Sequence, residues 1–183
     1  MTIPNVITLL RLFLVPAVVY AMLIGEMGWA FAGFLAAGVS DALDGFIARH
    51  FNQQSELGAY LDPAADKLLM VSVFVVLGIM GHLPLWLVIA AVSRDGLIVA
   101  AVLLSSVMGR PVTMKPLLVS KANTAVQIAL AVVVLGELAF SVDAWPVGQV
   151  LVWLSGALTV ASAAAYLVAW LRHMSGHGDG RNA

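Results

Sequence analysis

Four aspartates at helical spacing stand out in an otherwise apolar part of the sequence. Asp41 and Asp44 are three positions apart, so their carboxylates share one face of a helix. Asp62 and Asp66 are four positions apart and share one face of a second helix. If the two helices are neighbours, four carboxylates converge, and such all-oxygen ligation favours Mg²⁺, Mn²⁺ or Ca²⁺. Two such cations bridged by shared carboxylates would form a clamp for a phosphate or diphosphate.

The residues beside the first pair suit a phosphorylated ligand. Gly45 and Ala48 lie on the same helical face as the two aspartates and would let a bulky ligand approach the backbone. Arg49 lies on the flank of this face and supplies a planar donor fork for phosphate oxygens. His50 and His82, both expected in loops, are the alternative candidates for a catalytic base.

The aspartates are also compatible with roles outside metal-dependent catalysis. Asp62 precedes Pro63, and this pair is typical of a helix N-cap followed by a first-turn proline, although a capping aspartate can also bind a metal. An intramembrane aspartate can also serve packing or proton relay. A cation transporter or channel would use the cluster as an ion path, and it predicts flux without chemistry.

Composition places the chain among membrane proteins. Of its 183 residues, 62% are apolar and 10% charged, and the mean hydropathy is +1.01, outside the range of ordinary soluble domains. The formal net charge of −1 argues against a nucleic-acid partner. The absence of cysteine excludes disulfides, thiolate metal sites and thiol nucleophiles.

Apolar runs predict an all-α, polytopic membrane protein with six transmembrane helices. The runs lie near residues 5–25, 28–49, 63–81, 84–108, 117–138 and 145–171. The last run is free of charged residues, whereas the other five are shorter or carry charges that must be hidden from lipid. A single membrane domain over residues 1–174 is expected, and the glycine-rich tail at 175–183 is expected to be disordered.

Six crossings would put both termini and the polar loops near 50–62 and 109–116 on one side of the membrane. Seven of the nine basic residues fall on that side: Arg49, Lys67, Arg110, Lys115, Lys121, Arg172 and Arg181. The positive-inside rule therefore predicts that this side faces the cytoplasm. The absence of an Arg-rich transit peptide favours a bacterial inner (plasma) membrane over an organellar one.

The remaining two cations, Arg11 and Arg94, lie inside apolar runs. The first is expected to snorkel from an interfacial helix whose start is capped by Asn5 or Thr8. The second is followed directly by Asp95, so the two are expected to form an ion pair inside the bundle, with contact to the substrate as the alternative role.

The segment containing the aspartates resembles the signature of the CDP-alcohol phosphotransferases. The matching residues are Asp41, Asp44, Gly45, Ala48, Arg49, Gly58, Asp62 and Asp66. The length of the chain and the six predicted helices agree with this family. The resemblance implies an integral membrane enzyme, usually a homodimer, that moves a substituted phosphoryl group from a CDP-linked donor to an alcohol and releases CMP.

The resemblance also implies a role for each aspartate. Asp41, Asp44 and Asp62 look like the ligands of a first metal ion. A second ion would share Asp41 and Asp62 and add Asp66, which also looks like the base that deprotonates the acceptor hydroxyl. The two ions would be Mg²⁺ or Mn²⁺. The cytidine diphosphate would be held by residues that match Gly45, Arg49, Ser55 and Gly58.

Three further segments bear on the acceptor alcohol. The first helix, with Ile3-Pro4-Asn5, is similar to that of the phosphatidylglycerophosphate and cardiolipin synthase branch. The string from Ser120 to Gln127 and the triplet Ser93-Arg94-Asp95 look like the eukaryotic-type cardiolipin synthase versions. At the positions of the string from Ser120 to Gln127, phosphatidylglycerophosphate synthases more often carry a second lysine. One lysine fewer suits a phosphodiester better than a dianionic phosphomonoester.

The resemblance therefore predicts CDP-diacylglycerol as donor and phosphatidylglycerol as acceptor, with cardiolipin and CMP as products. The alternative acceptor is glycerol 3-phosphate, used by phosphatidylglycerophosphate synthases. Lys121, Lys115 and Arg110 are the candidates for contacts with the acceptor or with lipid phosphates. An ordinary juxtamembrane role, the attraction of anionic headgroups at about 1 kcal/mol per cation, competes with that assignment.

Overall fold

The computed structural model describes three stretches of backbone, residues 3–51, 56–107 and 118–175. Within them, side chains are described for residues 10–40, 65–101, 104, 118–144 and 146–171. The predictions for Ser55, Arg110, Lys115, Arg181 and nearly all of the tail lie outside the described residues.

Six helices occupy almost the whole described backbone, which contains no strand. They are α1 (Ile3–Leu23), α2 (Met27–Phe51), α3 (Glu56–Ile79), α4 (Leu85–Val107), α5 (Leu118–Phe140) and α6 (Trp145–Ser175). The all-α prediction is confirmed, and five of the helices begin within a turn of their predicted starts. The exception, α3, begins well before Pro63.

Three predictions about helix ends are wrong. Asp62 and Pro63 lie inside α3 and do not start it, because a proline removes one backbone hydrogen bond without necessarily ending a helix. Asn5 and Thr8 lie inside α1, which begins at Ile3, so they are not its N-cap. His50 lies at the end of α2 and not in a loop.

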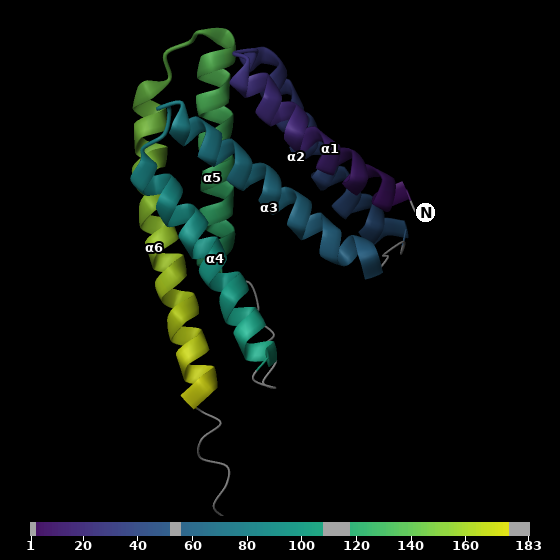
Figure 1. Ribbon diagram of the computed structural model, residues 1–183, viewed down its shortest axis with the longest axis vertical. Helices are drawn as coiled ribbons and strands as arrows, with labels where there is room; N and C mark the ends of the chain where they lie inside the picture. Colours follow the sequence, from purple (N-terminus) through teal and green to yellow (C-terminus); the bar gives the residue numbers. More distant parts are fainter. Residues whose placement is uncertain (1–2, 52–55, 108–117, 176–183) are drawn as a thin grey trace, which may run out of the picture.

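The helices form two legs that meet at one end of the molecule (Figure 1). The first leg consists of α1, α2 and α3, with α1 packed on both of the others. The second leg consists of α4, α5 and α6, with α6 packed on both of the others. Contacts of α2 with α5 and of α3 with α4 join the legs. The end of α2 and the start of α3 lie together at the far end of the first leg.

Backbone hydrogen bonds close the turn between α3 and α4. Gly81 has a φ of +82°, and its N–H donates to the carbonyl of Gly78 at 3.1 Å. The N–H of His82 donates to the carbonyl of Leu77 at 2.9 Å, which completes a Schellman motif. The prediction that His82 lies in a loop is thereby confirmed. Gly25, with a φ of +83°, closes the turn between α1 and α2 in the same way.

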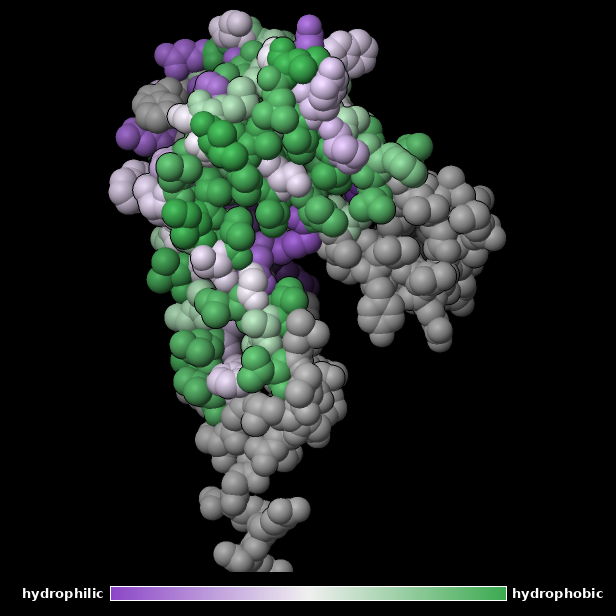
Figure 2. Space-filling model, viewed as in Figure 1, coloured by the Kyte–Doolittle hydropathy of each residue, from purple (hydrophilic) through white to green (hydrophobic). Residues whose placement is uncertain are grey.

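The apolar core lies where the helices cross, and much of the outer surface is also apolar. Met22, Leu77, Leu87 and Leu130 are fully buried. In contrast, large side chains such as Trp29 are mostly exposed, and Figure 2 shows a largely hydrophobic face. Hydrophilic side chains gather at its upper end and in the notch between the legs. An apolar surface of this extent suits contact with lipid.

Two stretches of the described chain are long and apolar enough to cross a membrane, Leu118–Phe140 and Pro146–Leu171. The apolar stretches Leu10–Leu23 and Met27–Ser40 are shorter. Six membrane crossings therefore stay a prediction.

The prediction that Arg11 snorkels is wrong. Its exposed fraction is only 1%, so the guanidinium lies inside the helical bundle and does not reach toward an interface.

Candidate active site

The fold brings the two aspartate-bearing segments to the same level of neighbouring helices. Asp41 and Asp44 lie in the last turns of α2, and Asp62 and Asp66 lie in the first turns of α3. At 1.5 Å per residue, Asp44 and Asp62 each lie about 10 Å from the connection between the helices. The two helices contact each other, and both pack on α1. The backbone is thus arranged as convergence of the carboxylates requires.

Of these four carboxylates, only Asp66 belongs to the described side chains, where it is half-buried and makes polar or electrostatic contact. The side chains of Asp41, Asp44 and Asp62 lie outside that set, as do those of Gly45, Ala48, Arg49 and Gly58. No three His, Asp or Glu side chains gather among the residues whose side chains are described. The metal ligands and the nucleotide contacts therefore stay predictions.

An ion-pair network begins at the residue after Asp66. The Nζ of Lys67 lies 2.6 Å from Oδ1 of Asp95, and this pair joins α3 to α4. The same carboxylate oxygen lies 2.7 Å from Nη1 of Arg94, which confirms the predicted Arg94–Asp95 pair. Oδ1 of Asp95 thus pairs with two cations, one from α3 and one from α4.

Arg94 fastens this network to the second leg. Its Nε and Nη2 donate to Oγ of Ser162 in α6 at 3.1 and 2.8 Å. Nη2 also donates to Oγ of Ser120 in α5, and the guanidinium carbon lies 5.6 Å from the ring centre of Tyr166. Only 3% of Arg94 is exposed. With so many donors engaged, Arg94 acts as an internal clamp of α4, α5 and α6.

The polar residues of the acceptor-related string face the helix interface. Oδ1 of Asn123 accepts a hydrogen bond from Oγ1 of Thr159 at 3.0 Å, and Nε2 of Gln127 donates to the same hydroxyl at 3.5 Å. All three side chains are buried. Lys121, by contrast, is exposed and available to a ligand or a lipid headgroup.

A ladder of polar side chains along α6 is not among the predicted features. Ser155, Thr159, Ser162 and Tyr166 are buried and follow the i, i+4, i+7, i+11 spacing of one helical face. The signal for it in the sequence is that spacing, because small polar residues in an uncharged apolar run typically bond to neighbouring helices.

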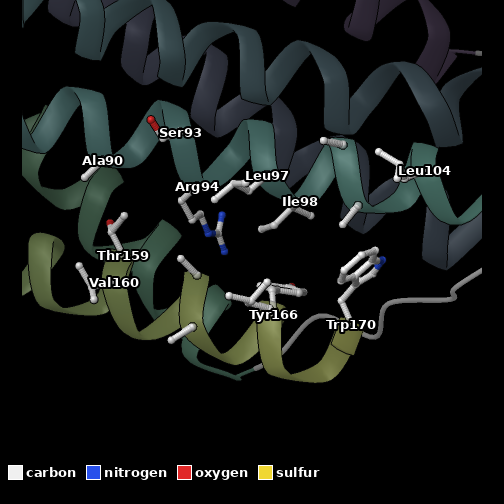
Figure 3. A pocket seen from close by; sticks show the side chains of 15 residues that line it. Ala90, Ser93, Arg94, Leu97, Ile98, Leu104, Thr159, Val160, Tyr166 and Trp170 are labelled. Atoms are coloured by element: carbon white, nitrogen blue, oxygen red, sulfur yellow. The ribbon is translucent and has the colours of Figure 1, made fainter. Parts of the chain in front are cut away.

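A cavity of about 580 Å³ lies between α4 and α6, beside Arg94 (Figure 3). Leu97, Ile98, Leu104 and Leu167 contribute apolar walls, and several alanines leave the space open. Among the described residues, polar groups enter the lining at Ser93, Arg94, Thr159, Tyr166 and the indole of Trp170. Such walls suit a hydrocarbon chain better than a water-soluble ligand.

His82 is poorly placed to act as the base. It is exposed on the turn between α3 and α4, sixteen positions along the chain from Asp66. Most of that separation is helix, so the two residues lie on the order of 20 Å apart. Direct proton transfer at the aspartates needs hydrogen-bond reach, which His82 lacks.

Comparison with known proteins gives a family and several relatives. A family model described as CDP-alcohol phosphatidyltransferase matches residues 1–161. A putative cardiolipin synthase of Mycobacterium tuberculosis is 48% identical over 99 residues, covering 54% of this chain and 47% of the relative. The cardiolipin synthase (CMP-forming) of Homo sapiens is 34% identical over 181 residues, covering 90% of this chain and 60% of the relative.

A third relative, the cardiolipin synthase (CMP-forming) of Streptomyces coelicolor, is 41% identical over 108 residues, 56% of this chain and 50% of the relative. The chain spans about half of the length of these two bacterial relatives. The range matched by the family model contains all four aspartates, Arg49, Lys67 and the Arg94–Asp95 pair. The chain belongs to the CDP-alcohol phosphatidyltransferase family.

Proposed function

We propose that this protein is a membrane-bound cardiolipin synthase that transfers a phosphatidyl group from CDP-diacylglycerol to phosphatidylglycerol. The observation that carries the proposal is the family match over residues 1–161, which includes the whole aspartate signature. The names of the relatives support phosphatidylglycerol as the acceptor.

The proposed reaction is a single displacement at phosphorus. A glycerol hydroxyl of phosphatidylglycerol forms a bond to the lipid-side phosphorus of CDP-diacylglycerol. The bond between that phosphorus and the bridging oxygen of the diphosphate breaks, and CMP leaves with the electron pair. The carboxylate of Asp66 takes the proton of the attacking hydroxyl. Such transfers depend mainly on positioning and on neutralisation of charge.

Two divalent cations, Mg²⁺ or Mn²⁺, fit the proposed donor set because it consists of carboxylate oxygens on adjacent helices. Asp41, Asp44 and Asp62 would hold one ion, and Asp41, Asp62 and Asp66 would hold the other. When bound, the ions neutralise the charge of the diphosphate. This assignment accords with the general dependence of the family on divalent cations.

The cytidine diphosphate would lie along the end of α2 and the start of α3. Arg49 would donate to phosphate oxygens, while Gly45 and Ala48 leave room for the ligand beside the backbone. Ser55 and Gly58 would complete the contacts between the two helices.

Three observations support a lipid acceptor. The apolar cavity beside Arg94 can take a hydrocarbon chain, and it belongs to the leg that does not carry the aspartates. Lys121 is exposed at the start of α5, where it can meet a phosphodiester; Lys115 and Arg110 are proposed for the same task. The relatives that match along most of this chain are named for cardiolipin synthesis. Glycerol 3-phosphate is the alternative acceptor.

The proposed setting is a bacterial plasma membrane crossed six times, with both termini and the active site on the cytoplasmic side. The apolar outer surface supports membrane embedding. The basic residues near the proposed cytoplasmic helix ends support the orientation. Residues 1–174 would form one membrane domain, and the protein would act as a homodimer.

An acceptor assay tests the proposal. Purified protein in lipid nanodiscs receives CDP-diacylglycerol and Mn²⁺ or Mg²⁺, and CMP release is followed with phosphatidylglycerol or glycerol 3-phosphate added in turn. We expect CMP and cardiolipin with phosphatidylglycerol. Release with glycerol 3-phosphate alone would reassign the acceptor. Cation flux through liposomes without any CMP release would support a transporter instead.

A further inference from the structure

The geometry points to Asp95 as a positioning residue that holds the ammonium of Lys67 away from the carboxylates proposed to bind metal. The inference rests on the proposed metal site but concerns residues that site does not include. It assigns a task to a helix, α4, that carries none of the four signature aspartates.

The position of Lys67 in the sequence explains why its ammonium must be held away from the proposed metal site. Lys67 directly follows Asp66, so a flexible cation is attached next to a proposed metal ligand. A lysine ammonium is a compact point charge on a four-carbon stem. If it were free to approach the carboxylates, it would pair with them and oppose the binding of a divalent ion through like-charge repulsion.

The contacts show where the ammonium is held. Nζ of Lys67 lies 2.6 Å from Oδ1 of Asp95, on the helix opposite. The Lys67 side chain is 40% exposed, so packing alone does not fix its direction. The ion pair with Asp95, whose side chain is 13% exposed, supplies that direction.

Asp95 is itself held independently of Lys67. Its Oδ1 lies 2.7 Å from Nη1 of Arg94, and Arg94 is anchored by Ser162 and Ser120. Removal of the lysine therefore leaves Asp95 paired. Removal of the Asp95 charge releases Lys67 and leaves the buried Arg94 bonded to its two serines but without its counter-charge, so the fold of this variant must be checked. This asymmetry allows the positioning role to be separated from a general structural role.

The test measures Mn²⁺ binding to the full-length protein in nanodiscs, without either lipid substrate, by the loss of the free-ion signal in electron paramagnetic resonance. Asp95→Asn should raise the Kd for Mn²⁺ by about tenfold, because the released ammonium adds a like charge near the ion. Lys67→Gln should leave the Kd within about twofold of wild type, and the double variant should return to that value.

Glu137→Gln is the matched control, since it removes one carboxylate near the start of α6, where Glu137 Oε1 accepts the N–H of Ala144 at 2.7 Å. We expect its Kd for Mn²⁺ to equal that of wild type. Circular dichroism and a thermal unfolding curve accompany each variant.

Several results would overturn the inference. An unchanged Kd in Asp95→Asn would do so, as would a double variant that binds as weakly as Asp95→Asn, because loss of structure is not rescued by removing the lysine. If Asp95→Asn fails to fold, the Lys67→Gln variant decides the question. Clearly tighter Mn²⁺ binding in this variant than in wild type would mean that Lys67 already competes with the metal ion in the wild-type protein, which contradicts the inference. Absence of Mn²⁺ binding in the wild type would also end it, whereas absence of CMP release with the expected Mn²⁺ pattern would refute only the proposed reaction.

Discussion

Thr159 of α6 and Asn123 of α5 are joined by a hydrogen bond of 3.0 Å between Oγ1 and Oδ1, at a level where both side chains are buried. Asn123 belongs to a string that, by resemblance, bears on the choice of acceptor. Its observed contact is with a neighbouring helix. The amide nitrogen Nδ2 of Asn123 is buried and lacks a hydrogen-bond partner among the described residues. The string therefore contributes to helix packing as well as carrying the exposed Lys121.

Asn123→Ala should lower the free energy of unfolding by about 1 kcal/mol, because Thr159 loses the acceptor of its hydrogen bond. For a chain of this length, the melting temperature should fall by about 2 to 4 °C. Thermal unfolding in detergent checks this value. Lys121→Ala is the control and should melt like wild type, since the lysine is exposed. Equal melting of the two variants would remove the packing role of Asn123.

Arg94→Lys should destabilise the protein far more than a conservative exchange usually does. A lysine cannot reproduce the fork that reaches Asp95, Ser120 and Ser162 together. Breaking a buried charged network costs about 3 kcal/mol, which we expect to see as a large drop in melting temperature. Ser93→Ala, at the exposed neighbour of Arg94, serves as the control. A melting temperature within about 2 °C of wild type would contradict the clamp.

Asp66→Asn should reduce turnover by at least about 10²-fold while CDP-diacylglycerol still binds, because the variant loses the proposed base. Asp41→Asn should weaken the binding of metal and nucleotide together, since Asp41 is proposed to ligate both ions. CMP release and equilibrium binding of the donor measure the two effects separately. Wild-type rates in Asp66→Asn would remove Asp66 as the base.

Ala163→Phe should raise the KM for phosphatidylglycerol with long acyl chains, because the new ring occupies the cavity between α4 and α6. We expect about a tenfold increase for the long-chain acceptor and a much smaller one for a short-chain analogue. Val168→Phe on the same helix is the control, because Val168 is exposed and does not line the cavity. An unchanged KM in Ala163→Phe would show that the cavity does not take the acceptor chain.

The parts of the molecule that follow from local sequence are predictable. Apolar runs separated by Gly25 and Gly81 give the helices and the turns between them, because turn chemistry is local. The Arg94–Asp95 pair is also local, since two opposite charges adjacent in an apolar run have few other partners.

Features that depend on packing are not predictable in the same way. The burial of Arg11 depends on how α1 packs against α2 and α3, which its own run of residues does not reveal. The Lys67–Asp95 pair joins residues far apart in the chain and depends on the approach of α3 to α4. The early start of α3 reflects helix formers ahead of Pro63, where the proline pattern favours a boundary at that position.

Gly81 lies midway between the two partners of that ion pair, with fourteen positions of chain on either side, to Lys67 and to Asp95. The turn thus lies at the same distance along the chain from each partner of the ion pair. A residue inserted or deleted within α4, between Leu85 and Asp95, would turn Asp95 by about 100° around the helix axis and away from Lys67. The number of helical residues between the turn and Asp95 is therefore constrained by the ion pair, although none of them carries a charge that takes part in catalysis.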